Sequence, residues 1–319
     1  MNDEIRMTND KEGRHRSREY GTLRLPFVIR ASSFVIDSSF GFRHSPFLCG
    51  LPALALLLFF FVIPLIALAH ATLRGSATAS GATTGFAHIE QLLADRLLWE
   101  LLGFTFALAA ALTVICLSLG YALALFLWGL KGRWKVAAVF ALLVPKLSNI
   151  LITAYGLKLL LGEAGPVNRA LIFSGLVGAP LPLVHNRIGV LISETCFILP
   201  YTALILWITL ERLDVELLSA AQGLGASPWH IFRRVTFPLS RPGLVVAATI
   251  TLVWGLGAYV GPVLFGSPQE ITLAVDIQRQ AFENQDWPRA AFEALLLLAT
   301  LGAIVVLWEA RRRRSEVPR

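Results

Sequence analysis

The chain has 319 residues, of which 55% are apolar and only 15% are charged, and its mean hydropathy is +0.65. A soluble domain of this length would need far more charge to cover its surface, so the composition excludes one. The net charge of +7 would suit a nucleic-acid partner, but in a membrane chain it is typical of the positive-inside bias.

Several apolar segments exceed the roughly 18 residues that a transmembrane helix needs. We predict an all-α, polytopic helical bundle with six spans, over residues 47–69, 101–128, 136–160, 188–210, 244–265 and 289–308. The third span contains Pro145, Lys146 and Asn149 and is therefore expected to be broken. The first ends in an A-x-A pattern that could mark signal-peptide cleavage, but it is longer than the usual core of about 7–15 residues. We therefore favour a first transmembrane helix over 47–69.

Lysine and arginine residues predict the orientation of these spans. Of the 28, 20 lie in residues 1–46, 129–135, 211–243 and after position 308. Cytoplasmic loops carry such an excess, so both termini and the 211–243 loop are predicted to be cytoplasmic. Residues 1–46 are polar and expected to form a disordered tail, and residues 309–319 form a basic tail.

The 211–243 loop interrupts the oily chain with a short, glycine-hinged, basic segment that predicts two helices and a turn. Asp214 can cap a first helix, and Gly225 can supply the left-handed residue that ends it. Ser227 is a good N-cap, and Pro228 a good first residue, for a second helix.

The second helix is predicted to carry a mixed aromatic and basic face. Trp229, Phe232 and Arg233 follow one another at the i, i+3 and i+4 spacing that brings side chains together. We expect Pro238 and Pro242 to stop this helix before the fifth span. Physical chemistry alone leaves open an amphipathic loop that lies on lipid headgroups.

The segment also resembles a known signature. The pattern is Ala220-Ala221, three residues, Gly225, nine residues, Val235, one residue and Phe237-Pro238. It resembles the EAA motif of binding-protein-dependent ABC-importer permeases, the MetI-like family. Ser219 stands where that family usually has glutamate, and Phe237 replaces leucine. The stretches "NILITAYGLKLLLGEAGPVN", "FILPYTALILWITLERLD" and "ENQDWPRAAFEALLLL" look like the first permease subunit of spermidine/putrescine importers.

This resemblance implies a type I importer permease with a core of five helices over residues 101–308 and a coupling loop over 211–243. It implies an inner-membrane, multi-pass transport subunit rather than an enzyme, carrying a polyamine or a related amine such as aminoethylphosphonate. The implied partners are a second homologous permease, two ATP-binding subunits and a periplasmic solute-binding protein, within the membrane lipid. The residues that the resemblance assigns to ATPase coupling are Ser219, Ala220, Ala221, Gly225, Ala226, Ser227, Trp229, Phe232, Arg233 and Pro238.

No phosphate-cradling GxxxxGK[ST] motif occurs in the sequence, so we expect no cofactor on this chain and place ATP and Mg on the partner ATPase. All three cysteines, Cys49, Cys116 and Cys196, lie inside apolar runs, which leaves no disulfide framework or cysteine-based metal site. No HExxH, GxSxG or paired His/Asp cluster supports a membrane enzyme. We therefore predict neither catalytic residues nor a metal.

Two charges within predicted spans, Lys146 and Glu194, are candidates for the solute pathway. They could instead form an ion pair that fixes the third span to the fourth, or a span boundary could be misplaced. Asn149 and Tyr155 are further pathway candidates, although each could equally be an interhelical hydrogen bonder. In a secondary transporter, the alternative class, Lys146 and Glu194 would be an ion relay, but such a protein has no need of the glycine-hinged loop.

The loop after the fifth span is where the resemblance places the docking of a binding protein. Its candidate residues are Asp276, Glu283, Asp286 and Trp287. For Asp286 the alternative is an N-cap of the last span, with Trp287 as an anchor at the membrane interface.

Overall fold

The computed structural model describes residues 46–74, 76–78, 81–83 and 85–316. The tail predicted over residues 1–46 lies outside this part of the chain except for its last residue. The described chain divides into two units at Ala55/Leu56, within the first helix, α2 (Pro46–Arg74). The following paragraphs concern the second unit.

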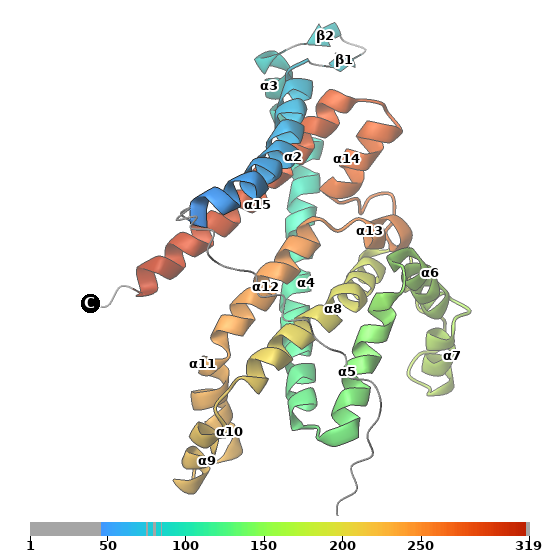
Figure 1. Ribbon diagram of the computed structural model, residues 1–319. Coiled ribbons are helices and arrows are strands. Elements are labelled where there is room, and N and C mark those ends of the chain that lie inside the picture. Colours follow the sequence, from blue (N-terminus) through green and yellow to red (C-terminus); the bar gives the residue numbers. More distant parts are fainter. Residues whose placement is uncertain (1–45, 75, 79–80, 84, 317–319) are drawn as a thin grey trace, which may run out of the picture. The chain divides into compact units, whose positions relative to one another are not determined.

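The second unit is almost entirely helical, as predicted (Figure 1). After α2, two three-residue strands, β1 (Ser76–Thr78) and β2 (Gly81–Thr83), pair antiparallel. The remaining α-helices before the loop are α3 (Phe86–Ala94), α4 (Arg96–Gly129), α5 (Gly132–Leu147), α6 (Ile150–Leu161), α7 (Pro166–Phe173) and α8 (Arg187–Glu211). After them come α9 (Val215–Gly223), α10 (Pro228–Ile231), the π-helix η1 (Phe232–Thr236), α11 (Phe237–Leu239), α12 (Arg241–Leu256), α13 (Val260–Phe265), α14 (Leu273–Phe282) and α15 (Trp287–Glu316).

Five described helical segments are long and apolar enough to cross a membrane, and a sixth arises if a bent pair counts as one span. The five are Leu51–Arg74, Arg96–Gly129, Ile150–Phe173, Arg187–Glu211 and Trp287–Val306, and the bent pair is Pro228–Leu239 with Arg241–Leu256. The predicted break in the third span is confirmed, because α5 ends at Leu147 and α6 begins at Ile150. The qualifying apolar segment there starts at Ile150, later than the predicted residue 136.

The fifth predicted span, residues 244–265, consists of two helices rather than one. Helix α12 ends at Leu256, and α13 begins only at Val260. Gly257 is the C-cap of α12 and donates its N–H to carbonyls of the preceding turn, including that of Val253 at 3.2 Å. Glycine lowers helix stability by about 1 kcal/mol relative to alanine, so the glycines of "WGLGAYVGP" favour a break.

Helices α4, α8 and α12 form the centre of the unit and meet through small residues (Figure 1). A Cβ added at Gly255 would lie 2.7 Å from the Cα of Ala109, so only glycine lets α12 approach α4 this closely. The hydroxyls of Thr202 and Thr251 hydrogen-bond at 2.9 Å between α8 and α12. Close backbone approach and interhelical hydroxyl bonds are the main sources of helix association in a bilayer.

Candidate functional site

The loop between α8 and α12 contains the predicted helix, turn and helix. The Asp214 carboxylate accepts the N–H of Glu216 at 2.9 Å and caps α9, as predicted. Gly225 has φ +79°, and its N–H donates to the carbonyl of Gln222 at 2.9 Å. The N–H of Ala226 donates to the carbonyl of Ala221 at 3.2 Å, and this second bond completes a Schellman motif. The predicted glycine hinge is therefore confirmed as local backbone geometry.

The second helix begins as predicted and ends before the fifth span. Ser227 accepts the N–H of His230 at 3.4 Å, and Pro228 occupies the first turn of α10. The helix continues through η1 into α11 and ends at Leu239, one residue past Pro238 and before α12 begins at Arg241, so the expected stop before the fifth span is confirmed. In a π-helical turn, N–H groups bond five residues back, and here the N–H of Phe237 reaches the carbonyl of Phe232. This widened turn accommodates the proline, and the chain then bends by 62° into α12.

We call residues 215–239, from α9 to α11, the coupling segment. Its second helix is tied to α4 by aromatic and hydroxyl contacts. Phe232 packs edge-on against Tyr121 at 5.9 Å between ring centroids, and Trp229 stacks on Phe232 at 5.4 Å. The Tyr121 hydroxyl hydrogen-bonds that of Ser240 at 2.9 Å. Sequence reasoning missed Tyr121, which lies far away in the chain and inside a predicted span.

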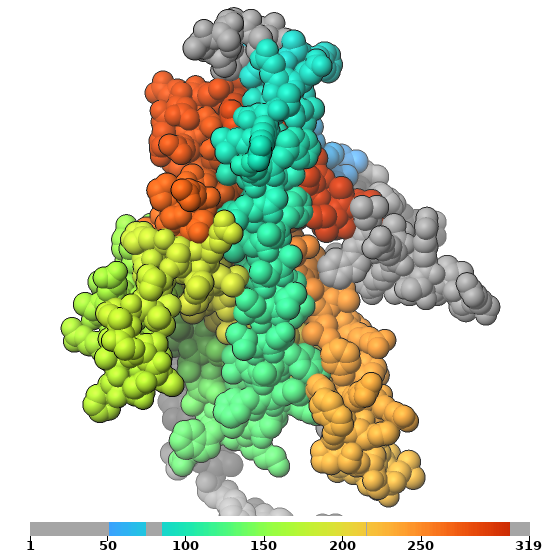
Figure 2. All heavy atoms as spheres, turned by 180° about the vertical axis from the view of Figure 1, so that it is seen from behind, coloured from blue at the N-terminus to red at the C-terminus, as the bar shows by residue number. Residues whose placement is uncertain are grey.

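The two aromatic residues of the predicted face differ in exposure. Phe232 is half-buried, whereas Trp229 is 68% exposed and Arg233 is also exposed. Leu217 and Leu224 of the first helix are 50% and 90% exposed. The outward apolar surface of the coupling segment therefore includes Trp229, Leu217 and Leu224, with Phe237 and Leu239 less exposed, while Phe232 is half-buried against Tyr121 of α4. Figure 2 shows this segment, in gold and orange, beside the C-terminal part of α4.

The other predicted coupling residues all lie on this segment. Exposed positions are Ser219, Ala220, Gly225 and Ser227, and half-buried positions are Ala221, Ala226 and Pro238. A cavity of about 460 Å³ opens between the segment and α4. Its walls are Leu117, Ser118, Tyr121, Trp229, Phe232, Arg233, Phe237 and Leu244.

Glu194 lies on α8 and is only 2% exposed. One carboxylate oxygen accepts the indole N–H of Trp254 at 2.9 Å, and the other accepts the backbone N–H of Gly261 at 3.0 Å. A Cβ at Gly261 would lie 2.5 Å from that second oxygen, so the close approach requires glycine. The break between α12 and α13 frees this N–H from the helix and presents it to the carboxylate.

Lys146 does not form the direct ion pair with Glu194 that was one of the alternatives. Its ammonium group donates to the carbonyl of Cys196 at 3.4 Å and to the carbonyl of Phe197. It lies 5.4 Å from the ring centroid of Tyr201 and 5.9 Å from that of Phe197. Within the described chain, Lys146 therefore joins α5 to α8 through carbonyls and aromatic rings rather than through a carboxylate.

The two remaining pathway candidates lie on α6. The side-chain oxygen of Asn149 accepts the N–H of Leu151 at 2.8 Å and caps the helix, which differs from the interhelical bond we considered. Tyr155 is 57% exposed. The structure brings neither residue to Glu194.

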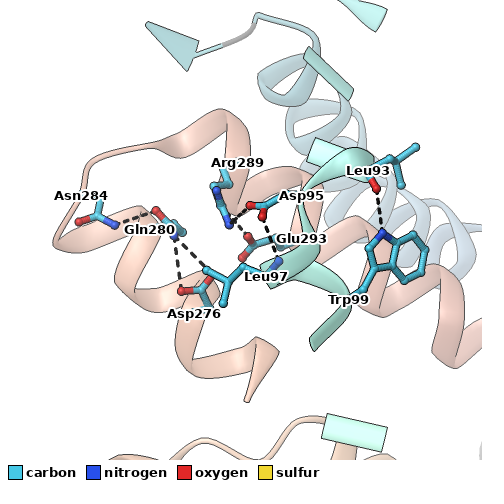
Figure 3. A network of polar contacts seen from close by, with 9 residues as sticks. All are labelled: Leu93, Asp95, Leu97, Trp99, Asp276, Gln280, Asn284, Arg289 and Glu293. Carbon is cyan, nitrogen blue, oxygen red and sulfur yellow. Dashed lines mark hydrogen bonds and ion pairs between the residues drawn. The ribbon is translucent and has the colours of Figure 1, made fainter. Parts of the chain in front are cut away.

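The candidate docking residues near α14 separate into buried and exposed groups. Asp276 is only 5% exposed, and the amide of Gln280 lies 3.4 Å from each of its carboxylate oxygens (Figure 3). A side chain enclosed in this way does not meet a docking protein, so that assignment for Asp276 is wrong. Its position was not predictable from sequence because the enclosing residues come from α4 and α15.

Arg289 is the centre of this network. Its guanidinium lies 3.0 Å from Asp95, at the start of α4, and 3.0 Å from Glu293, which is 1% exposed (Figure 3). Sequence reasoning missed Asp95 and Glu293. An acidic residue four positions after an arginine at a helix start is a signal that could have indicated the second.

The other docking candidates are more accessible. Glu283 is exposed and pairs with Arg279 at 3.4 Å. Asp286 accepts the N–H of Arg289 at 3.2 Å, which is the N-cap that we weighed against docking. Trp287 is 57% exposed and packs edge-on against Phe282 at 5.8 Å between centroids. Among the residues that the structure describes, no group of three His, Cys, Asp or Glu side chains could hold a metal ion.

A helical membrane chain with a helix-turn-helix segment between two of its spans has the architecture of an ABC-importer permease. The fold resembles a chain of a bacterial alginate ABC transporter crystallised with its periplasmic protein, with a TM-score of 0.67 and 19% identity over 84% of this chain and 94% of that one. At this identity the likeness shows the fold alone. No family model matches the chain.

Sequence comparison gives the particular family. The chain is 32% identical over 221 residues to the spermidine/putrescine transport system permease protein PotB of Escherichia coli K12, covering 69% of this chain and 80% of that protein. It is 27% identical over 257 residues to PotB of Haemophilus influenzae, covering 79% and 88%. The chain belongs to the PotB family of ABC-importer permeases and is a transport subunit.

Proposed function

We propose that this chain forms half of the translocation pathway of an ATP-driven importer for polyamines such as spermidine and putrescine, or for a related small amine. The support for this solute class is the likeness to PotB along two thirds of the chain. In this proposal residues 101–308 form the permease core. Both termini and the 211–243 loop face the cytoplasm, in accord with the lysine and arginine bias.

The observation that carries the proposal is the construction of the coupling segment. It combines outward Trp229, Leu217 and Leu224 with an inner side held on α4 through Phe232. Exposed apolar side chains on a short rigid helix suit helix-in-groove recognition by a separate protein. We assign that groove to an ATP-binding subunit, which carries ATP and Mg. A second permease and a periplasmic binding protein complete the assembly.

This construction favours the importer over an ion-coupled secondary transporter. A secondary transporter couples through charges inside the membrane and needs no apolar helix presented to a motor. Lys146 and Glu194 make separate contacts instead of the direct pair of a simple relay.

The test is the substitution Trp229→Ala in the assembled transporter. Truncation of a central aromatic anchor costs about 2 kcal/mol, which corresponds to roughly a 30-fold loss of affinity for the ATPase subunits. We expect the same loss in ATP-driven uptake of radiolabelled putrescine at limiting ATPase concentration. Affinity is measured by titrating purified ATPase onto the permease pair in nanodiscs.

Trp134→Ala is the matched control, because Trp134 is 66% exposed and lies at the start of α5, outside the coupling segment. We expect this variant to bind the ATPase as the parent does. If the Trp229→Ala variant and the parent bind the ATPase subunits with equal affinity, the assignment of Trp229 to a groove of the ATP-binding subunit is refuted. Uptake by this chain without ATP would refute the importer itself.

A further inference from the structure

Helix α8 is continuous but contains a proline, Pro200. Proline has no N–H, so the carbonyl four residues earlier loses its helical donor. That carbonyl belongs to Cys196, and it accepts the ammonium of Lys146 at 3.4 Å. The neighbouring carbonyl of Phe197 accepts from the same ammonium. The proline thus leaves an outward-facing acceptor that a cation from another helix fills.

Two aromatic rings complete the surroundings of this ammonium. The ring centroids of Tyr201 and Phe197 lie 5.4 Å and 5.9 Å from the Lys146 nitrogen. Aromatic faces attract cations through their quadrupole, most effectively where water is excluded. Two carbonyl oxygens with two aromatic rings form a set of partners for an ammonium ion. We call this set, made by Cys196, Phe197 and Tyr201, the ammonium cage.

The ammonium cage opens onto a cavity of about 250 Å³. The cavity is lined by Pro145, Lys146, Ser148, Ile150, Thr153, Phe197, Tyr201 and Trp254. This volume equals that of about eight water molecules at roughly 30 Å³ each, which is room for a short aliphatic amine. Trp254 also donates to the buried Glu194 carboxylate, so a negative charge lies behind the cavity wall.

Lys146, which occupies the ammonium cage in the structure, belongs to the loosely packed helix α5. Helix α5 is described throughout, and none of its residues is buried. Lys146 lies in its last turn, next to the break before α6. At its other end α5 is tied to α8 by the Lys135–Glu211 ion pair, at 2.6 Å. Withdrawal of the Lys146 side chain therefore disrupts little apolar packing.

We propose that the ammonium cage binds a primary ammonium group of the transported solute, and that Lys146 is a tethered competitor that occupies the cage until the solute arrives. The inference rests on the proposed function for its solute class. Two ammonium ions cannot share the same carbonyls, so solute binding expels Lys146 and releases α5 from α8 at this point. Solute occupancy is thereby linked to the freedom of the third span.

The test uses the complete transporter in nanodiscs, with putrescine as the probe. Lys146→Met removes the competing ammonium and keeps the length of the side chain. A site that is free only about a tenth of the time gains roughly tenfold in apparent affinity when its competitor is removed. We therefore expect equilibrium binding of radiolabelled putrescine, without the binding protein, to tighten by about that factor. The KM of uptake should fall in the same direction.

Two further variants separate this role from a structural tether. Lys158→Met removes a lysine of α6 that does not line the cavity and should leave putrescine binding unchanged. Tyr201→Leu removes one ring of the cage and should weaken binding in the parent and in the Lys146→Met background. Thermal unfolding is measured for every variant.

Putrescine binding that is unchanged or weaker in the Lys146→Met transporter, with or without a lower Tm, would overturn the inference and leave Lys146 as a tether. If the parent imports putrescine and the Lys146→Met variant binds it no more tightly, the competitor role of Lys146 is refuted while the proposed function stands. A parent that imports no amine loses both the proposed function and the cage.

Discussion

Replacing Glu194 with glutamine tests a buried carboxylate of α8 that is only 2% exposed. Both carboxylate oxygens of Glu194 accept N–H groups, one from Trp254 and one from Gly261. A glutamine side chain has a single oxygen, and its NH₂ group cannot accept, so one of these donors loses its partner. A buried donor left unsatisfied costs about 1–3 kcal/mol. The shift in Tm per kcal/mol is about 2–4 °C for a domain of 150–250 residues and about 2 °C or less for a longer chain such as this one.

Thermal unfolding of the purified chain in detergent, followed by circular dichroism, measures this loss. The matched control is Glu163→Gln, because Glu163 is exposed in the connection between α6 and α7. We expect the control to change Tm by less than about 1 °C, since exposed substitutions change stability little. Equal Tm values for the two variants would refute the assignment of the two N–H groups to this carboxylate.

Transport by the same variant separates stability from a pathway role. If Glu194 helps to receive a cationic solute, the Glu194→Gln transporter should show a higher KM for putrescine at temperatures well below its Tm. Unchanged affinity and rate would remove Glu194 from the pathway and leave it as the residue that fixes the break before α13.

Two other substitutions test the packing of the helices. Gly255→Ala should be less favourable than Gly103→Ala by about 1–3 kcal/mol in chemical denaturation, because an added Cβ meets backbone at Gly255 and nothing within 4 Å at Gly103. Arg289→Gln should destabilise the chain by about 3 kcal/mol by leaving the buried Glu293 carboxylate uncompensated, whereas Arg96→Gln, at a side chain 91% exposed, should change stability by under about 0.5 kcal/mol in the same assay. Equal effects within either pair would contradict the corresponding contact.

Local chemistry made the coupling segment predictable. Asp214, Gly225 and Ser227 act on the backbone within a few residues of themselves, so the sequence alone carries the required information. The same reasoning placed the helix end near Pro238 but did not foresee the π-helical turn that precedes it. A proline predicts where strain must be relieved, but the form of the relief depends on the packing around it.

Long-range contacts limited the prediction of the site. Helix α14, which carries the buried Asp276, packs against α15 and α4, and the inward direction of Phe232 depends on Tyr121 of α4. The sequence indicated that Lys146 and Glu194 are charges within spans, but it could not show that Lys146 donates to carbonyls of α8 and that Glu194 accepts the N–H of Gly261. Pro200, inside α8, and Gly257, at the end of α12, were visible as residue types, but the partners of the freed groups were not.

The break before α13 also bears on how the coupling segment could act at a distance. Helix α12 begins at the 62° bend that follows this segment and ends at Leu256, a few residues before the Gly261 N–H that Glu194 accepts. Between these two points α12 packs closely on α4 at Gly255 and bonds α8 through Thr251, so we predict that a displacement at its first end is transmitted to its second. We infer that Glu194 fixes the C-terminal end of α12 through its bond to Gly261. In the Glu194→Gln transporter this end is held less firmly, and more ATP should be hydrolysed for each putrescine imported. An unchanged ratio of ATP hydrolysed to putrescine imported would show that α12 does not transmit movement from the coupling segment.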